Sequence, residues 1–288
     1  MKTILAIIAS PRKLGNSEIM AKEVSRRIAD PHELKLLRLA DFDIKSCTGC
    51  YRCLFKEERC VLKDDLYRIL DAIAEADALI LSAPTYFLGA NAAVKNLLDR
   101  GLSFYGVADR LWEKPAVGIA LAGIAGLEGY TPLVIESFLK ILLCDIKQVR
   151  VVYGALPGEV FTTPRNLQIA ADLAAALTAP PPGKTAFSCP LCGGETFRFL
   201  GEDRVKCMLC SNNGRLRMEA GQPVVDISRG DHALFLSREE AVDHGRWLRQ
   251  MKGRFLEQKD TLKKIVLDYR QQGRWITPQT DAKAPEPD

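Results

Sequence analysis

Short apolar runs alternate with segments of helical periodicity through the first 155 residues of the chain. Five runs are rich in Ile, Leu, Val and Ala, as expected for strands that are covered on both faces. They comprise residues 3–9, 33–39, 78–84, 116–122 and 148–154. Between and after these runs, apolar residues recur every three or four positions, which is typical of helices with one buried face. The helices are predicted over residues 17–29, 65–75, 92–100, 130–143 and 166–177.

This alternation predicts an α/β fold, because helices on both faces of a parallel sheet bury strands of this kind. Five strands suit a doubly wound sheet in the flavodoxin-like order 2-1-3-4-5. In such sheets ligands bind beyond the carboxyl ends of the strands, where the chain order reverses. Binding loops are therefore expected after the first, third and fourth strands.

The pattern changes at the breaker run APPPGK, which marks a domain boundary. Short strand-like pieces around two CxxC pairs follow, and then a long polar helix from Ser237 to about Gln271. Ser237 and Glu240 form a capping box at its start. Its apolar seam consists of Leu248, Met251, Phe255, Leu262, Ile265 and Tyr269. The predicted units are a sheet domain at 1–180, a four-cysteine module at 181–230, an amphipathic helix at 231–275 and a disordered tail at 276–288.

The amino-acid composition mainly excludes classes of partner. Hydrophobic residues make up 47% and charged residues 26% of 288 residues, which suits a globular protein with a sizeable core. The net charge of +4 and the lack of a Lys/Arg block give no reason to expect nucleic acid or a membrane as partner. The opening MKTILAIIAS is interpreted as a buried strand rather than a signal peptide. Small molecules or proteins are the expected partners.

Eight of the nine cysteines fall into two clusters with metal-ligand spacing, which indicates a reducing compartment, the cytoplasm. The ninth, Cys144, is expected in an apolar helix as a small buried side chain. The histidines His32, His232 and His244 show no ligand spacing and are assigned to structural positions.

The first cluster lies in a loop after the second predicted strand. Cys47, Cys50, Cys53 and Cys60 give the spacing C-x2-C-x2-C-x6-C. Three thiolates from one curling loop can cover three corners of a cubane, and a flanking cysteine can reach the fourth. Such a tight curl converges poorly on one small ion. A 4Fe-4S cluster is therefore favoured, and zinc or free thiols are the alternatives.

The second cluster has the spacing C-x2-C-x14-C-x2-C and consists of Cys189, Cys192, Cys207 and Cys210. Two knuckles that supply two sulfurs each are the usual way to build a closed tetrahedral site. Structural zinc is the expected occupant, because a module of this size has too little core to fold alone. An iron ion of the rubredoxin type is the functional alternative.

The loop ASPRKLGNSE after the first strand lacks both G-x-G-x-x-G and the Walker lysine. Ser10, Asn16 and Ser17 offer short hydrogen-bonding side chains, and Gly15 allows a tight turn. With the amino end of a helix beside them, these residues suit a terminal phosphate monoester. An ordinary capped helix would use the same residue types.

The loop SAPTYFLG after the third strand offers rigid backbone and aromatic surface on which a flat heterocycle can stack. Together with SPRKLGNS, it resembles the NADPH-dependent FMN reductases, a flavodoxin-like family. The resemblance implies that the FMN phosphate is held by Ser10, Arg12, Asn16 and Ser17. It implies that the isoalloxazine is lined by Pro84, Thr85, Tyr86, Phe87 and Gly89, with Ala122 and Gly123 closing the third side. Ala83 stands where that family often has Ser or Thr.

With the first cysteine motif added, residues 1–155 resemble the iron-sulfur flavoproteins, a branch of that group. The resemblance implies that one FMN and one 4Fe-4S cluster relay electrons, commonly from ferredoxin, in a homo-oligomer. An electron-transfer oxidoreductase that couples one-electron and two-electron steps is expected, without a catalytic acid or base. Two alternatives are a clusterless NAD(P)H-dependent FMN or quinone reductase, and a redox-sensing regulatory protein that binds through its zinc ribbon. Clusterless relatives carry a DDM-like segment where this chain has Lys63 to Leu66, although all four thiols are present here.

Overall fold

The computed structural model describes residues 1–55, 59–180, 183, 185–231, 236–274 and 276. It divides into two compact units, residues 1–246 and residues 247–288. The first unit contains a parallel sheet, a smaller antiparallel sheet and the start of a long helix. His232 and all of the predicted tail except Ile276 lie outside the described residues.

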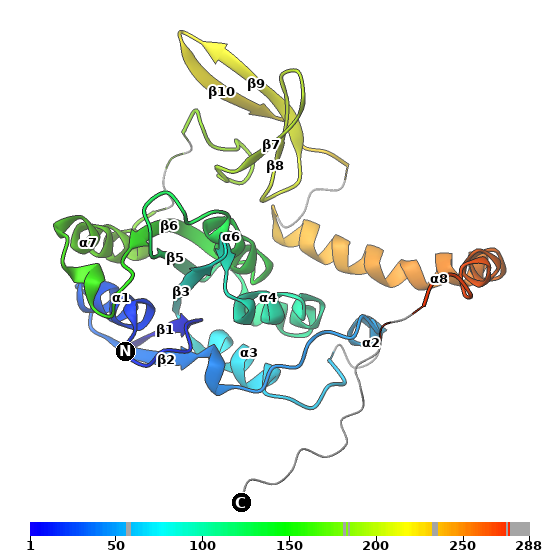
Figure 1. Cartoon of the computed structure of the whole chain (residues 1–288), viewed down its shortest axis with the longest axis horizontal. Coiled ribbons are helices and arrows are strands. Elements are labelled where there is room, and N and C mark those ends of the chain that lie inside the picture. Colours follow the sequence, from blue (N-terminus) through cyan, green and yellow to red (C-terminus); the bar gives the residue numbers. More distant parts are fainter. Residues whose placement is uncertain (56–58, 181–182, 184, 232–235, 275, 277–288) are drawn as a thin grey trace, which may run out of the picture. The chain divides into compact units, whose positions relative to one another are not determined.

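The central sheet has the predicted strand order (Figure 1). Its parallel strands are β1 (Lys2–Ile8), β2 (His32–Arg38), β3 (Ala78–Tyr86), β5 (Pro115–Ala122) and β6 (Asp145–Tyr153). They run in the order β2-β1-β3-β5-β6, which confirms a flavodoxin-like arrangement. A short strand, β4 (Gly89–Ala90), folds back antiparallel on β3. The sequence pattern did not predict this hairpin.

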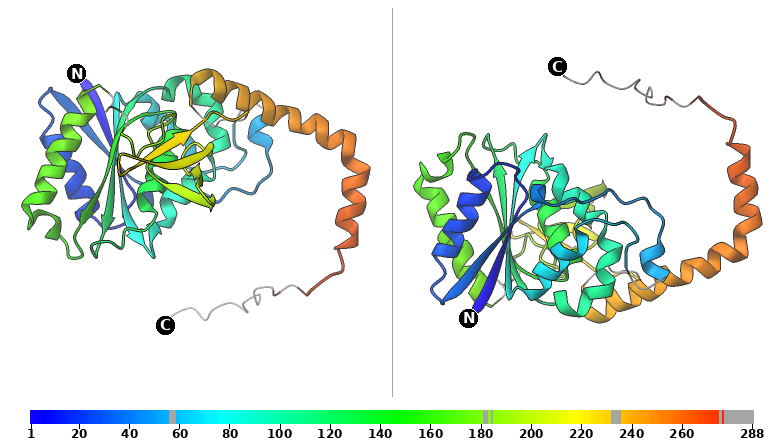
Figure 2. Two further views of the ribbon diagram at one scale, coloured as in Figure 1. Left: turned by 90° about the horizontal axis from the view of Figure 1, so that it is seen from above. Right: turned by 90° about the horizontal axis from the view of Figure 1, so that it is seen from below.

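Helices cover both faces of the sheet (Figure 2). The longer ones are α1 (Asn16–Arg26), α3 (Leu66–Glu75), α4 (Ala92–Leu98), α6 (Thr131–Ile141) and α7 (Pro164–Thr178). Met20 of α1 and Leu173 of α7 belong to one buried cluster, whereas Ile69 of α3 and Phe138 of α6 belong to the other. This two-sided burial explains why the strand segments are apolar almost throughout.

Short helical turns complete the sheet domain. They are α2 (Arg52–Phe55), α5 (Ala108–Leu111) and the 3-10 turns η1 (Leu39–Asp41), η2 (Gly101–Val107) and η3 (Glu159–Phe161). One of them, α2, lies within the first cysteine loop and contains Cys53, and it contacts η2.

Cys144 does not lie in a helix, contrary to the prediction. Helix α6 ends at Ile141, and Leu143 adopts a left-handed conformation with φ of 60°. The amide of Cys144 then donates to the carbonyl of Leu139, which closes the last turn in the manner of a glycine-type C-cap. Cys144 is half-buried in the turn that leads into β6.

The four-cysteine module forms an antiparallel sheet in the order β10-β9-β8-β7. Its strands are β7 (Phe197–Gly201), β8 (Arg204–Cys207), β9 (Asn213–Glu219) and β10 (Gln222–Ile227). Among the described residues, the buried apolar cluster of the module contains three of the four cysteines together with Val205, Leu209, Val225 and Ile227, and partly buried side chains such as Phe197 and Leu216 pack on it. So small a core contributes little stability by itself.

The last helix, α8 (Arg238–Asp268), begins with the predicted cap, because the amide of Glu240 donates to Ser237 Oγ at 3.3 Å. Within the first unit, Arg238 pairs with Asp109, and Gly245 packs closely on the ring of Tyr105. In the second unit, Phe255 and Ile265 of the predicted seam are exposed. Among the described helices, none combines the length and the apolar character needed to cross a membrane.

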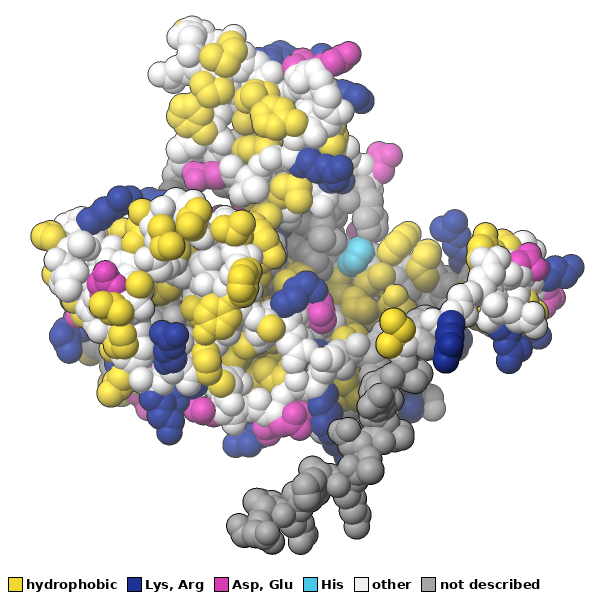
Figure 3. All heavy atoms as spheres, in the orientation of Figure 1, with side chains coloured by type: hydrophobic (Ala, Val, Ile, Leu, Met, Phe, Trp, Pro, Cys, Tyr) yellow, Lys and Arg dark blue, Asp and Glu magenta, His cyan; other side chains and the backbone are white. Residues whose placement is uncertain are grey.

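The surface carries no extended patch of one charge on the face drawn in Figure 3, where basic and acidic side chains are interspersed. This distribution agrees with the small net charge of +4. It gives no support to a nucleic-acid interface on that face.

Candidate functional site

The loop after β1 presents the amino end of α1 beside two buried hydroxyls. Ser10 and Ser17 are almost fully buried, whereas Arg12 is exposed. A Cβ at Gly15 would lie 3.1 Å from the Cβ of Arg12, so the turn leaves little room for a side chain there. The helix starts without a side-chain cap. Its first amides and the two serines therefore form a surface suited to an anion.

The side chain of Asn16 connects the start of α1 to the loop after β6. Its Nδ2 donates to the carbonyl oxygens of Gly154 at 2.9 Å and Leu156 at 3.0 Å. Its Oδ1 accepts from the amide of Gly158 at 2.9 Å. These bonds use both ends of the carboxamide to hold the loop after β6. The backbone amide of Asn16 lies at the start of α1.

A buried carboxylate, Glu18, fixes the tip of the same loop. It accepts from the amide of Leu14 at 2.9 Å, and it pairs with Lys22 and Arg38, each at 2.6 Å. Burial by itself would raise the pKa of Glu18, but the hydrogen bonds from Lys22, Leu14 and Arg38 lower this pKa to about 2. The contact holds Leu14 in a left-handed conformation with φ of 53°.

The β3–β4 hairpin carries the aromatic residues predicted to line a ring. Its two-residue tip, Phe87 and Leu88, has φ of 48° and 67°, the geometry of a type I′ turn. Neither residue is glycine, so the tip is strained, and strain of this kind is concentrated at functional sites. Phe87 is fully exposed, and Tyr86, the last residue of β3 before the tip, is also exposed. Pro84 lies within β3.

The hairpin is held against the loop after β5. Thr85 Oγ1 donates to Thr131 Oγ1 at 2.9 Å, and the amide of Tyr130 donates to the carbonyl of Leu88 at 2.7 Å. A Cβ at Gly129 would lie 2.1 Å from that carbonyl oxygen, so only glycine fits there. Gly89 faces Tyr130, whose hydroxyl would be 2.6 Å from a Cβ at position 89.

Asn91 ties the hairpin to the first loop. Its Nδ2 donates to the carbonyl of Ala9 at 2.8 Å, while its buried Oδ1 has no partner among the described residues. Ala122, at the end of β5, accepts from the amide of Gly154 at 3.0 Å, and Gly123 follows it. The structure thus brings the three predicted loops together at one edge of the sheet.

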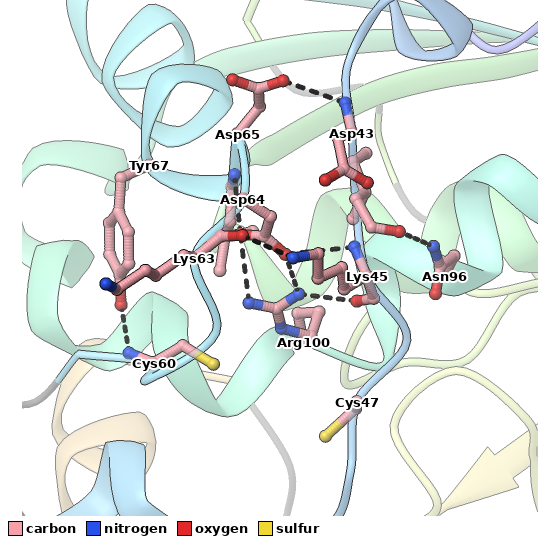
Figure 4. Close-up of polar contacts among 12 residues, drawn as sticks. Asp43, Lys45, Cys47, Cys60, Lys63, Asp64, Asp65, Tyr67, Asn96 and Arg100 are labelled. Carbon is pink, nitrogen blue, oxygen red and sulfur yellow. Dashed lines mark hydrogen bonds and ion pairs between the residues drawn. The ribbon is translucent and has the colours of Figure 1, made fainter.

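Hydrogen bonds between residues 43–45 and residues 63–65 join the two ends of the first cysteine loop (Figure 4). The amide of Asp43 donates to Asp65 Oδ2, and the amide of Asp65 donates back to the carbonyl of Asp43, both at 2.9 Å. The amide of Lys45 donates to Asp64 Oδ2 at 3.1 Å, and its Nζ donates to the carbonyl of Lys63 at 2.9 Å. The chain therefore enters and leaves the loop along paired segments.

A buried ion pair lies among these hydrogen bonds at the base of the loop. Arg100 Nη1 donates to Asp64 Oδ2 and to the carbonyl of Lys45, both at 2.6 Å. The side chains of Arg100 and Asp64 are 1% and 0% exposed. Burial disfavours both charged forms, but the hydrogen bond between the side chains lowers the pKa of Asp64 and raises the pKa of Arg100. The pair is therefore ionised.

The four thiols of the loop have unequal surroundings. Cys47 and Cys50 are exposed, whereas Cys53 and Cys60 are half-buried. Within the described parts of the chain, these four do not meet in a group as compact as that of the second cluster.

Polar side chains lie against the two half-buried thiols. The amide of Cys60 donates to the hydroxyl of Tyr67 at 2.5 Å. Burial raises the pKa of Cys53, and a hydrogen bond from Ser103 opposes this rise. At the exposed side, hydrogen bonds from the backbone of Arg52 and from Thr48 lower the pKa of Cys50.

The second cysteine cluster is compact. The sulfurs of Cys189, Cys192, Cys207 and Cys210 all lie within 4.8 Å of one another. Cys189 and Cys210 are 3.7 Å apart, and Cys192 and Cys207 are 3.6 Å apart. Asn212 Nδ2 and the amide of Gly194 donate to two of the sulfurs at 3.3 Å and 3.4 Å. Four converging thiols with such donors around them suit one thiophilic metal ion.

Several positions that shape the site were not identified from the sequence. Asn91 and Arg100 follow the ring loop in the chain and look like ordinary helix and turn residues. Their partners are distant in sequence, for example Arg100 and Asp64, which are 36 positions apart. The one local signal for these contacts is the pair of adjacent acidic residues, Asp64 and Asp65, that follows Cys60 at the end of the loop.

Comparison with known proteins shows the family to which this chain is related. Residues 2–138 match the family model of NADPH-dependent FMN reductases. An iron-sulfur flavoprotein of Archaeoglobus fulgidus is 41% identical over 100 residues, which cover 34% of this chain and 47% of the relative. The chain spans about half the length of the first curated relatives that it matches.

A second iron-sulfur flavoprotein of Archaeoglobus fulgidus is 33% identical over 165 residues, which cover 56% of this chain and 72% of that protein. Among solved structures, a flavone reductase is similar with a TM-score of 0.68 at 20% identity, covering 96% of this chain and 100% of that chain. At this identity the similarity shows the fold alone, and it agrees with the parallel α/β architecture. Because the second relative is matched over most of its length, this chain belongs to the iron-sulfur flavoprotein family.

Proposed function

We propose that the protein is an FMN-dependent electron-transfer oxidoreductase with a 4Fe-4S cluster in its first cysteine loop. The main support is the placement of that loop after β2, at the same carboxyl edge of the parallel sheet as the three loops that suit a flavin. FMN exchanges one or two electrons and a 4Fe-4S cluster exchanges one, so the two together couple two-electron and one-electron chemistry.

In this proposal the chain contributes binding and orientation. Ser10, Ser17 and the first amides of α1 hold the terminal phosphate, with Arg12 as an exposed cation beside it. Asn16 and Asn91 keep the surrounding loops in place. The ring is lined by Pro84, Thr85, Tyr86, Phe87 and Gly89, with Ala122 and Gly123 at the third side.

Cys47, Cys50, Cys53 and Cys60 are the proposed cluster ligands. Because Cys47 and Cys50 are exposed, the corresponding side of the cluster is open to an external redox partner. An electron-carrier protein such as ferredoxin, or NAD(P)H acting through the flavin, supplies the electrons. Family resemblance favours a homo-oligomer in which cluster and flavin approach each other.

Zinc is the proposed occupant of the second cluster, with a structural role. Four protein sulfurs close the coordination shell and leave no position for water or substrate. The small core of the ribbon makes the metal its main source of stability.

FMN retention tests the phosphate site. Ser10→Ala and Ser17→Ala each remove a hydrogen bond to a charged group, which is worth about 1.5–3 kcal/mol, so each should weaken FMN binding roughly tenfold or more. Ser137→Ala, a half-buried serine of α6, is the control. The released cofactor is identified by chromatography. Recovery of FAD instead of FMN, or no flavin after reconstitution, would contradict the assignment.

Metal analysis tests the ribbon. Cys192→Ser should lose about one zinc per chain and become sensitive to protease between residues 185 and 230, because one of four metal bonds is broken. Cys144→Ser, which changes a cysteine outside both clusters, should keep its metal and its protease resistance. Iron at this site that changes oxidation state during turnover would show that the role of the site is redox rather than structural.

Replacing one ligand tests the cluster. Cys53→Ala should lose iron and sulfide but keep FMN, because the loops proposed for FMN follow other strands. Flavin reduction by a one-electron protein donor should then slow at least tenfold, while reduction by dithionite persists. Unchanged rates, with four titratable loop thiols in the active parent protein, would favour the clusterless reductase.

A further inference from the structure

A buried carboxamide, Asn212, connects the second cysteine cluster to the chain that follows β10. Asn212 is 4% exposed. Its Nδ2 donates to the Sγ and to the carbonyl oxygen of Cys210, both at 3.3 Å, and its Oδ1 accepts from the amide of Gly230 at 2.8 Å. These partners fix the orientation of the carboxamide, because a carbonyl oxygen can only accept and a backbone amide can only donate. The side chain therefore bridges a proposed metal ligand and a residue 18 positions after Asn212.

The backbone beside this side chain makes a second connection. The carbonyl of Asn213 accepts from the amide of Ser228 at 3.2 Å, and the carbonyl of Asn212 accepts from the amide of Cys207 at 2.9 Å. Segment 228–230 is thus attached at two points to the loop that carries the second CxxC pair. Because the apolar core of the ribbon is small, the shape of that loop is expected to depend on a bound metal.

The same segment is attached to the start of α8. Arg229 Nη1 pairs with Glu240 Oε1 at 2.8 Å. The other carboxylate oxygen of Glu240 accepts from the amide of Leu236 at 3.1 Å, directly before the cap residue Ser237. The side chain of Glu240 is only 20% exposed, so solvent screens this ion pair less than a fully exposed one. Segment 228–230 therefore connects the ribbon on one side with the first turn of α8 on the other.

The first turns of α8 contact the sheet domain next to the first cysteine loop. Arg238 pairs with Asp109, and its guanidinium lies 5.5 Å from the centre of the Trp112 ring. Gly245 packs on the ring of Tyr105, which belongs to η2, and η2 contacts α2 within that loop. The carboxylate of Asp109 is 81% exposed, so its ion pair contributes little by itself. The start of α8 therefore depends on its attachment to segment 228–230.

We propose that a metal ion bound by the second cysteine cluster holds the start of α8, residues 238–246, against the sheet domain through Asn212 and segment 228–230. The ribbon thus serves as a metal-dependent anchor for the helix, and its effect extends to η2 beside the first cysteine loop. This inference rests on the proposed metal site of the ribbon. It is independent of the flavin and of the metal in the first loop.

Hydrogen–deuterium exchange of backbone amides, measured by mass spectrometry, tests this connection in the full-length protein. The parent protein is compared before and after a chelator removes the ribbon metal, and again after Zn²⁺ is added back. Asn212→Ala removes the carboxamide and leaves all four sulfurs in place. Asn213→Ala is the matched control, because it changes the adjacent residue, whose side chain is exposed. Zinc and iron are measured in every sample.

Removal of the metal should speed exchange about tenfold or more in residues 228–230 and 238–246, and added Zn²⁺ should restore slow exchange. Asn212→Ala should keep its metal but exchange about tenfold faster in the same two segments, because a buried hydrogen bond is lost. Asn213→Ala should match the parent. The central strand β3 should exchange equally slowly in all samples.

The inference is wrong if residues 238–246 exchange at the same rate with and without the metal. It is also wrong if Asn212→Ala keeps its metal and exchanges like the parent in both segments. If Asn212→Ala loses its metal, removal and return of the metal in the parent decide the question. A parent protein without metal at the second cluster would refute the proposed zinc site as well, which distinguishes that outcome from a failure of the anchor alone.

Discussion

The buried ion pair between Arg100 and Asp64 is the interaction on which the first cysteine site depends. It joins both ends of the loop to the sheet domain, since Arg100 also binds the carbonyl of Lys45 and Asp64 binds the amides of Lys45 and Leu66. Removing one partner alone leaves an uncompensated buried charge, which typically costs about 3–5 kcal/mol. The loop thus has a rigid, buried base and an outer side on which Cys47 and Cys50 are exposed.

The same helix serves both candidate sites. Asn91, which holds the loop after β1, directly precedes α4, and Arg100 follows its last turn. A helix of seven residues spans about 10 Å and has few ways to deform. It therefore holds the loop after β1 and the first cysteine loop in fixed positions relative to each other. This arrangement gives a physical reason why the two motifs occur together in one domain.

The sequence predicts what depends on local pattern. Strands buried on both faces were recognisable as apolar runs, and the spacing of Cys189, Cys192, Cys207 and Cys210 already indicated a compact four-sulfur site. It did not predict the left-handed Phe87 and Leu88, because neither is the glycine or asparagine expected in such a turn. The end of α6 was placed too late for the same reason, since Leu143 acts there in the position of a glycine. Arg100 and Asn91 depend on contacts with residues distant in sequence, which no local pattern encodes.

The central claim is that the two cysteine motifs hold different metals and that the first lies beside a flavin. Anomalous diffraction from anaerobically grown crystals, measured at the iron and zinc absorption edges, tests it most directly. We expect an iron peak enclosed by Cys47, Cys50, Cys53 and Cys60, a zinc peak at Cys189, Cys192, Cys207 and Cys210, and flavin density at the edge where the loops after β1, β3 and β5 meet. Zinc or no metal in the first loop of crystals that contain flavin would contradict the account.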